Sequence, residues 1–300
     1  MIDLGIVILN WNTSALLKRC LETVFASEGE IVYRVVVVDN ASSDDSAAMV
    51  RAEFPNAELI VSPVNNGYSY GNNLGLRALG FNARGPAAPG APRYALLLNP
   101  DTEVPPEGLS AMTRFMDSRP EVGAAGPKLI LPDGSLDKAC RRGFPTPMVS
   151  LYHFTGLGKL FPRSPRFARY NMTYLDPDEE AEVDAVVGAY MQVRREALEE
   201  VGLLDEAFFM YGEDLDWAYR IQKAGWTIAY HPQVVVKHVK RAASRQSQRA
   251  QFEFWRAMLI FYRKHYRQTT PLWLHGLIMA GLLVKGGRSM WPEIRQPAIP

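Results

Sequence analysis

Short apolar runs alternate with segments of helical periodicity along the first 118 residues. Four runs rich in Val, Ile and Leu are typical of strands buried on both faces: Leu4–Asn10, Tyr33–Val38, Leu59–Ser62 and Tyr94–Leu98. The segments that follow them repeat apolar residues at helical spacing, which predicts helices at Ser14–Ser27, Asp44–Phe54, Asn72–Phe81 and Pro106–Ser118. This strand–helix order predicts an α/β fold, with a Rossmann-like, mostly parallel central sheet flanked by helices.

The pattern becomes less regular after residue 120. Asp133-Gly134 is a turn signal that predicts a hairpin over Leu129–Leu136. Residues 141–181 show no clear period and are predicted to form an irregular segment that shapes the site for a second substrate. Later elements are expected at Val183–Val193, Ala197–Val201, Asp214–Lys223, Trp226–Tyr230 and Val234–Lys237, with a basic, aromatic helix at 245–267.

The charge of the chain changes sign near its C-terminal end. The first 236 residues carry 21 basic and 30 acidic side chains, whereas residues 237–300 carry 12 basic and 2 acidic ones. Such a basic block favours a polyanion, and the apolar segment Leu272–Val284 that follows it indicates an anionic membrane surface rather than nucleic acid. This segment is too short to span a bilayer, which takes about 20 residues. The alternative is a C-terminal helix that packs on the rest of the domain.

Cysteine content and the first residues bear on location. Cys20 and Cys140 form neither a disulfide framework nor a zinc motif, and they fit a reducing cytosol. Met1–Val7 lacks the basic n-region of a signal peptide and is typical of a first strand. We therefore expect a cytoplasmic protein that lies at the inner face of the cell membrane.

Two aspartates directly follow predicted strands. Asp39 comes after Val35–Val38, and Asp101 belongs to Asn99-Pro100-Asp101 after Tyr94–Leu98. Ligands of open α/β sheets bind at the carboxyl ends of strands. Asp39 can therefore accept the imide N–H of uracil or thymine, or it can cap the next helix. Asp101 can hold a divalent metal ion with a diphosphate, or it can simply form a turn.

Other residues near these strand ends suit a nucleotide. Trp11 has a flat ring that can stack on a base, although it could equally pack in the core. The Gly- and Asn-rich loop Asn65–Gly75 runs into a predicted helix, where free backbone N–H groups suit a diphosphate.

A further acidic site lies at Gly212–Trp217. Glu213 and Asp214 begin a predicted helix, where a carboxylate can take the proton of an attacking hydroxyl group or can merely favour the helix dipole. His238 follows the strand-like Val234–Lys237 and is either a ligand for Mn²⁺ or a structural residue.

These motifs, in this order, resemble glycosyltransferase family 2, whose fold is called GT-A, and within it the bacterial rhamnosyltransferase-like members. The resemblance covers about residues 3–240 and rests on Asn10-Trp11-Asn12, Val38–Ser42, Asn65–Asn73, Asn99-Pro100-Asp101 and Phe208–Trp217. It implies a GT-A domain over 1–240, with a nucleotide-sugar half at about 1–130 and an acceptor half at about 131–240. A basic, amphipathic helical extension would follow at 241–300.

The resemblance also implies roles for single residues. Asp214 would be the catalytic base with Glu213 supporting it, and Asp101 and His238 would hold a divalent ion, Mn²⁺ or Mg²⁺. The residues implied in nucleotide-sugar binding are Asn10, Trp11, Asn12, Asp39, Asn40, Asn66, Gly67, Asn73, Asn99 and Asp101. Asn99 stands where many relatives carry Asp, a departure that we expect to weaken metal binding or to shift it towards His238.

The implied reaction is a single, inverting displacement. Its donor would be a dTDP- or UDP-sugar, with dTDP-L-rhamnose as the best match. Its acceptor would be a saccharide or polyprenyl-linked saccharide in cell-surface polysaccharide synthesis.

Three other functions are alternatives to this reaction. A dinucleotide-dependent oxidoreductase lacks support, because Asn10–Ser14 contains no Gly-x-Gly-x-x-Gly. A sugar-nucleotide nucleotidyltransferase would need a Gly-rich, basic loop at the same place. An inactive protein that binds saccharide or membrane on the same fold is the third alternative, and the intact Asp39, Asp101, Asp214 and His238 count against it.

Overall fold

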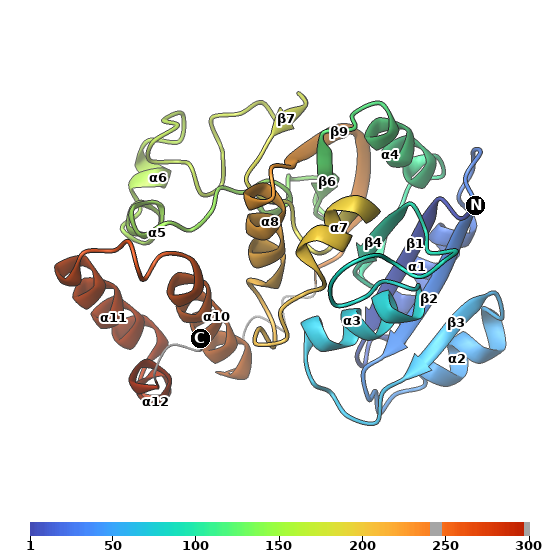
Figure 1. Ribbon diagram of the computed structural model, residues 1–300, viewed down its shortest axis with the longest axis horizontal. Coiled ribbons are helices and arrows are strands. Elements are labelled where there is room, and N and C mark those ends of the chain that lie inside the picture. Colours follow the sequence, from blue (N-terminus) through green and yellow to red (C-terminus); the bar gives the residue numbers. More distant parts are fainter. Residues whose placement is uncertain (241–247, 297–300) are drawn as a thin grey trace.

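One mixed sheet forms the centre of the molecule (Figure 1). The computed structural model describes residues 1–240 and 248–296. Within these residues the sheet has nine strands in the order β3-β2-β1-β4-β8-β6-β9-β5, with β7 paired to β9. The strands are β1 (Leu4–Asn10), β2 (Tyr33–Asp39), β3 (Ala57–Val61), β4 (Tyr94–Leu98), β5 (Thr102–Glu103), β6 (Val122–Ile130), β7 (Ala181–Glu182), β8 (Tyr190–Arg194) and β9 (Thr227–His238).

Most of the strands run in one direction. β1 pairs in parallel with β2 and β4, β2 with β3, and β6 with β9. β8 is antiparallel to both of its neighbours, β4 and β6, and the short β5 and β7 are antiparallel to β9. The predicted α/β class with a mostly parallel sheet is confirmed, and the carboxyl ends of β1, β2 and β4 share one edge.

Helices flank this sheet and extend the molecule to one side (Figure 1). The helices around the sheet are α1 (Ser14–Phe25), α2 (Ser46–Glu53), α3 (Tyr68–Ala78), α4 (Gly108–Asp117), α7 (Arg195–Val201) and α8 (Glu213–Lys223). The helices at the other end of the molecule are α5 (Pro147–Phe154), α6 (Leu157–Leu160), α10 (Gln248–His265), α11 (Leu272–Gly286) and α12 (Met290–Arg295).

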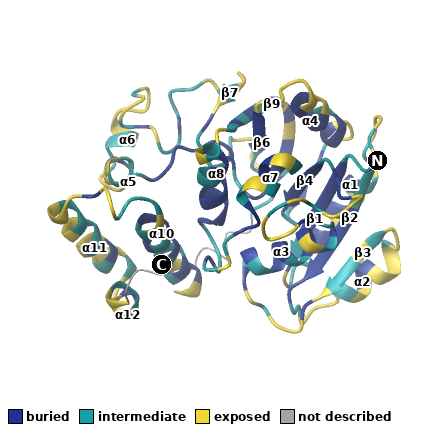
Figure 2. Ribbon diagram, viewed as in Figure 1, coloured by how far each residue is buried: buried dark blue, intermediate teal, exposed yellow. Residues whose placement is uncertain are grey.

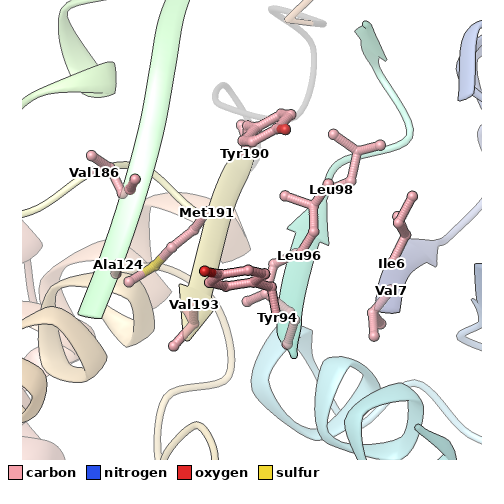
Figure 3. Packing of buried hydrophobic residues seen from close by; sticks show 14 of the residues in the cluster. Ile6, Val7, Tyr94, Leu96, Leu98, Ala124, Val186, Tyr190, Met191 and Val193 are labelled. Carbon is pink, nitrogen blue, oxygen red and sulfur yellow. The ribbon is translucent and has the colours of Figure 1, made fainter. Parts of the chain in front are cut away.

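Burial explains why the apolar runs became strands. All of β4 and the run Val35–Val38 of β2 are buried. Burying one such side chain contributes about 1.5–3 kcal/mol, so a register that turned these residues to solvent would be strongly disfavoured. Figure 3 shows side chains from neighbouring strands packed together in this core, among them Ile6, Val7, Leu96, Leu98, Met191 and Val193.

The second half of the domain differs from the prediction in detail. β6 begins at Val122, and the predicted hairpin is reduced to a bridge between Ile130 and Leu136. Val183–Val193 is not one strand, because only Tyr190–Arg194 pairs with β4. The two short strands expected before His238 are one strand, β9, whose register against β6 shifts. The segment predicted to be irregular contains α5 and α6.

The described part of the C-terminal extension is helical, as predicted. Ala257 and Phe261 of α10 join the main apolar core, so α10 packs on the domain. α11 and α12 pack on α10 around a second, smaller cluster made of Leu259, Leu282 and Met290. None of the helices in residues 1–240 and 248–296 is long and apolar enough to cross a membrane. The prediction for residues 241–247 lies outside the described residues.

Candidate active site

The parallel register of β1 and β2 places Asn10 beside Asp39 at the sheet edge. Asp39 is 2% exposed and accepts hydrogen bonds from Asn10 Nδ2 at 3.3 Å and from the Ser42 backbone N–H at 3.1 Å. A carboxylate has about four acceptor positions, so Asp39 retains capacity for a ligand. Asp39 does not cap α2, because Asp44 accepts the backbone N–H of Ser46 at that end.

Trp11 and Asn12 form the rim of this edge. Trp11 is 52% exposed, which excludes core packing and leaves its ring accessible to a planar ligand. Asn12 has a φ of 53° and Ala41 a φ of 61°, both in the left-handed region. Asn12 Oδ1 accepts the Ser43 N–H at 2.7 Å and so ties the loops after β1 and β2 together. Backbone strain of this kind clusters at functional sites.

The loop before α3 is closed by contacts with a distant loop. The Gly67 N–H donates to Asn65 Oδ1 at 3.0 Å, and the Tyr68 N–H donates to the Phe209 carbonyl at 2.6 Å. These two N–H groups are therefore not free for a diphosphate, contrary to the sequence-based expectation. Gly67 has a φ of 96°, and a Cβ there would lie 2.4 Å from the Phe209 oxygen, so this close contact requires glycine. Asn66 is exposed beside it.

Two asparagines near this loop differ in the hydrogen-bonding groups that they leave available to a ligand. Asn40 donates through Nδ2 to Asn65 Oδ1 at 3.0 Å, and its buried Oδ1 has no partner among the described residues. An unpaired buried acceptor is costly unless a ligand or water satisfies it. Asn73 instead exchanges hydrogen bonds with the Leu204 backbone in both directions, at 2.9 and 3.1 Å. Asn73 thus holds the chain before α8, and its role in binding the nucleotide-sugar stays a prediction.

The pairing of β9 with β5 brings His238 to Asp101. His238 Nε2 lies 3.3 Å from Asp101 Oδ1, and Nδ1 lies 2.8 Å from Asp137 Oδ2. Burial alone would lower the pKa of His238, but hydrogen bonds and charges from the two carboxylates raise it. Asp137 also accepts a bond from Lys240, and these partners hold the pKa of its carboxyl group low despite burial.

Asp101 and His238 fit a divalent ion as an incomplete set of ligands. A neutral imidazole that donates from Nδ1 to Asp137 turns the Nε2 lone pair towards Asp101, the arrangement typical of histidine ligands. No group of three or more His, Cys, Asp and Glu side chains that could hold a metal gathers among the described residues. Oxygens from a bound diphosphate or from water would have to complete the shell.

Tyr68 links the end of β4 to α8. Its hydroxyl group lies 3.1 Å from Asn99 Oδ1 and 2.9 Å from the Gly188 carbonyl, and the Gly188 N–H donates to Asp214 Oδ2 at 3.0 Å. Burial, then the two carboxylates that begin α8 and then Asp101, raise the pKa of Tyr68 well above its ordinary value. The structure thus brings together the acidic sites predicted at β4 and α8, and it engages Asn99 with Tyr68.

Buried contacts hold Asp214 at the start of α8. Oδ2 accepts from Arg142 Nη2 at 2.6 Å as well as from Gly188, and Oδ1 accepts the Leu215 N–H at 2.8 Å. Asp214 is 5% exposed and Arg142 is 9% exposed. Each carboxylate oxygen has two lone pairs, so Oδ1 retains one for the hydroxyl group of a substrate.

Glu213 differs from its neighbour in having a free oxygen. Its buried Oε2 has no hydrogen-bond partner within the described part of the chain. Burial, and then repulsion from Asp214, raises the pKa of Glu213 to about 8. The raised pKa favours the protonated form of Glu213, which can donate a hydrogen bond.

Three side chains of this site were missed by sequence reasoning. Tyr68, Arg142 and Asp137 contact predicted residues that are 31, 72 and 101 positions away, respectively, so no local pattern reveals these contacts. Two of the three lie in segments that the sequence did single out: Tyr68 in the loop Asn65–Gly75, and Arg142 in the segment 141–181 with its many arginine and aromatic residues.

Comparison with known proteins decides the family. A family model described as "Glycosyltransferase like family 2" matches residues 3–253. The chain belongs to this family. The resemblance seen in the sequence is thus confirmed, and with it the enzyme class: the protein is a family 2 glycosyltransferase.

Named relatives of this family 2 glycosyltransferase include rhamnosyltransferases. It is 32% identical over 238 residues to N-acetylglucosaminyl-diphospho-decaprenol L-rhamnosyltransferase of Mycobacterium tuberculosis, an alignment that covers 79% of this chain and 76% of the relative. It is 25% identical to rhamnosyltransferase WbbL of Escherichia coli, over 76% of this chain and 80% of the relative. A hexosyltransferase of Haloferax volcanii, Agl10, is 28% identical over 74% of this chain and 62% of the relative.

Solved structures confirm the GT-A fold. The mannosyltransferase PcManGT of Pyrobaculum calidifontis, in complex with GDP-Man and Mn²⁺, superposes with a TM-score of 0.60 at 16% identity, over 99% of this chain and 76% of that one. GalNAc-T7 with UDP, GalNAc and Mn²⁺ also gives 0.60, at 14% identity over 98% of this chain. The chain spans 56% of the length of GalNAc-T7.

Proposed function

We propose that this family 2 glycosyltransferase moves a sugar from a nucleotide-sugar to a hydroxyl group of an acceptor, with inversion at the anomeric carbon. The observation that carries the proposal is the hydrogen-bonded path from Asn99 through Tyr68 and Gly188 to Asp214. This path sets the Asp101 end of β4, suited to a donor diphosphate, beside a carboxylate suited to a proton.

The proposed reaction is a single displacement. The acceptor oxygen forms a bond to the anomeric carbon while the bond from that carbon to the diphosphate oxygen breaks, and the electron pair leaves with the nucleoside diphosphate. Asp214 Oδ1 accepts the hydroxyl proton, and the contacts of Oδ2 with Arg142 and Gly188 hold the carboxylate in position. No second carboxylate acts as a nucleophile, unlike in retaining glycosidases.

The proposal also assigns the residues that bind the nucleotide-sugar donor. Asp39 and Trp11 take the pyrimidine base, and the unpaired Oδ1 of Asn40 supports a polar ligand at this edge. Asp101 and His238 hold Mn²⁺ or Mg²⁺, which when bound offsets negative charge on the leaving diphosphate. The PcManGT and GalNAc-T7 structures both contain Mn²⁺, which supports this cofactor.

The substrates are proposed from the relatives. dTDP-L-rhamnose is the proposed donor, because two of the relatives are rhamnosyltransferases. The proposed acceptor is a polyprenyl-linked saccharide of cell-surface polysaccharide synthesis, since the mycobacterial relative is named for a diphospho-decaprenol acceptor. The enzyme would act at the cytoplasmic face of the membrane, with an anionic lipid surface as partner for 241–284.

Asp214→Asn tests this function. We expect the rate of sugar transfer to fall by roughly 10²–10⁴-fold, because the amide cannot accept the proton, while donor affinity stays within a few-fold. Transfer would be measured with dTDP-rhamnose and a lipid-linked acceptor, and donor affinity by calorimetry. Glu30→Gln, which removes an exposed carboxylate from the loop before β2, is the matched control.

The competing functions give different results in the same assay. An inactive binding protein would form no glycoside with either variant. A nucleotidyltransferase would also form none, and it would release pyrophosphate when supplied with dTTP and a sugar 1-phosphate. Full transfer activity in Asp214→Asn would show that another group takes the proton.

A further inference from the structure

α11 exposes apolar side chains along its outer face. Trp273, Leu277 and Val284 are 68, 63 and 81% exposed. Their spacing of four and seven residues places them on one side of the helix. Leu282 points to the other side and is buried in the small cluster with α10 and α12. A helix that faced only water would carry polar residues on its outer side, so this face indicates a partner.

α5 and α6 lie at the same end of the molecule as α11 (Figure 2) and carry a second group of exposed apolar side chains. Met148, Leu151, Phe154, Leu160 and Phe161 are between 42 and 70% exposed. Trp255 of α10 connects the two groups. Its ring centroid lies 5.2 Å from that of Phe154, and it also packs in the cluster of α10, α11 and α12.

The charges around these apolar groups have one dominant sign. α5, α6 and α11 contain no Asp or Glu. Exposed basic residues flank the apolar ones: Lys159 and Arg163 at α6, Lys285 and Arg288 at the end of α11, and Arg295 in α12. Apolar side chains surrounded by basic ones match the acyl and headgroup layers of an anionic bilayer.

We propose that α11, α5 and α6 together form a membrane-docking face, with α11 lying in the plane of an anionic bilayer interface. α11 has 15 residues, fewer than the roughly 20 that a membrane span requires, so it would lie in the interface and not cross it. The inference rests on the proposed function for the lipid-linked acceptor, and it adds the α5–α6 segment, with the depth and orientation of α11, to the basic C-terminal region.

Single-cysteine labelling measures which residues enter the lipid. Cys20 and Cys140 are buried, so a cysteine introduced by Leu277→Cys or Leu151→Cys gives one exposed position for an environment-sensitive fluorophore. Val32→Cys, at an exposed site before β2, is the matched control. With phosphatidylglycerol vesicles we expect blue-shifted emission and quenching by brominated lipid at 277 and 151, but not at 32.

A co-flotation assay with the full chain measures the strength of docking. Leu277→Glu is expected to weaken binding to phosphatidylglycerol vesicles roughly tenfold or more, whereas Val32→Glu leaves it unchanged. Unchanged emission at 277 and 151, or equal flotation of Leu277→Glu and the wild type, would overturn the proposal. So would equal binding to phosphatidylcholine vesicles, or a dimer that covers position 277 without lipid.

These assays use no donor or acceptor. Docking by an enzyme that fails to transfer rhamnose would leave this inference intact and reject the proposed function. Rhamnose transfer to a soluble acceptor without any docking would reject this inference and leave the proposed sugar transfer intact.

Discussion

The tautomer of His238 depends on a side chain that contacts neither the proposed metal nor the proposed substrates. Asp137 Oδ2 accepts from Nδ1 at 2.8 Å, so the neutral ring presents the Nε2 lone pair on the Asp101 side. Carboxylates in this second layer usually raise the affinity of a histidine for metal. Lys240 restrains Asp137 in turn.

Asp137→Asn is therefore expected to weaken Mn²⁺ binding by roughly 10–100-fold without unfolding the domain. The affinity would be measured from the electron paramagnetic resonance signal of free Mn²⁺ in the presence of dTDP, which requires no turnover. Asp133→Asn is the control, because Asp133 is exposed and bonds only within its own turn, to Ser135. Equal Mn²⁺ affinity in both variants would show that Asp137 does not position His238.

At the scale of elements, the feature that connects the C-terminal helices to the site is the contact between α8 and α10. Asp216 of α8, two residues after Asp214, is fully buried and contacts side chains of both α8 and α10. Its Oδ1 lies 2.8 Å from both His265 Nε2 and Lys264 Nζ of α10, and its Oδ2 lies 2.9 Å from Arg220 Nε. α10 is thus joined to α8, which carries the proposed base, by an ionic cluster around the buried carboxylate of Asp216.

Asp216 gives the α8–α10 contact a defined pH dependence. Burial opposes ionisation of Asp216, but His265, Arg220 and Lys264 outweigh it and lower its pKa from 3.8 to about 2. A depressed pKa in the folded state means that the stabilising contribution is fully present above pH 3.8 and is lost as the pH falls towards 2. Its size is about 2 kcal/mol.

Asp216→Asn is expected to lower the free energy of unfolding at pH 7 by about 2 kcal/mol, because Arg220, Lys264 and His265 lose the buried carboxylate that they share. The difference in the free energy of unfolding between variant and wild type should become smaller as the pH falls from 4.5 to 3. Urea unfolding at these three pH values tests this, with Asp45→Asn at an exposed position as control. A gap that stays constant with pH would mean that Asp216 is not the titrating group.

At the scale of the whole molecule, donor binding should depend on both the base and the metal. A ligand that binds only the folded state raises the melting temperature, by about 3–8 °C when it is present at 100 times its Kd. We expect dTDP or UDP with Mn²⁺ to give such a shift, because Asp39, Trp11, Asp101 and His238 lie at the same edge of the sheet.

The shift should disappear when EDTA replaces Mn²⁺, since the charge of the diphosphate is then left without a counter-ion. GDP and NAD serve as controls in the same thermal-shift panel. The proposed donor site would be contradicted if NAD alone raised the melting temperature, or if none of the nucleotides did.

Residues at the ends of buried strands were predictable, and residues that join distant segments were not. Asp39 and Asp101 come after short, continuous apolar runs that are typical of buried strands, so the sequence already places them at the sheet edge. Arg142 contacts Asp214 across 72 positions, and Tyr68 bonds Gly188 across 120, contacts that only the tertiary fold creates. The same reason explains why the predicted strand Val183–Val193 is longer than β8, since pairing with β4 sets the length of β8 and its own composition does not.

The place of β8 limits how this protein can be recombined. β8 comes late in the chain, yet it lies between β4 and β6, both of which precede residue 131. A chimera joined at residue 130, meant to combine one donor specificity with another acceptor specificity, would give β8 two foreign neighbours. Exchange of α5, α6 and their loops, the segment that the sequence predicts to shape the acceptor site, would instead leave the shared sheet as one inherited unit.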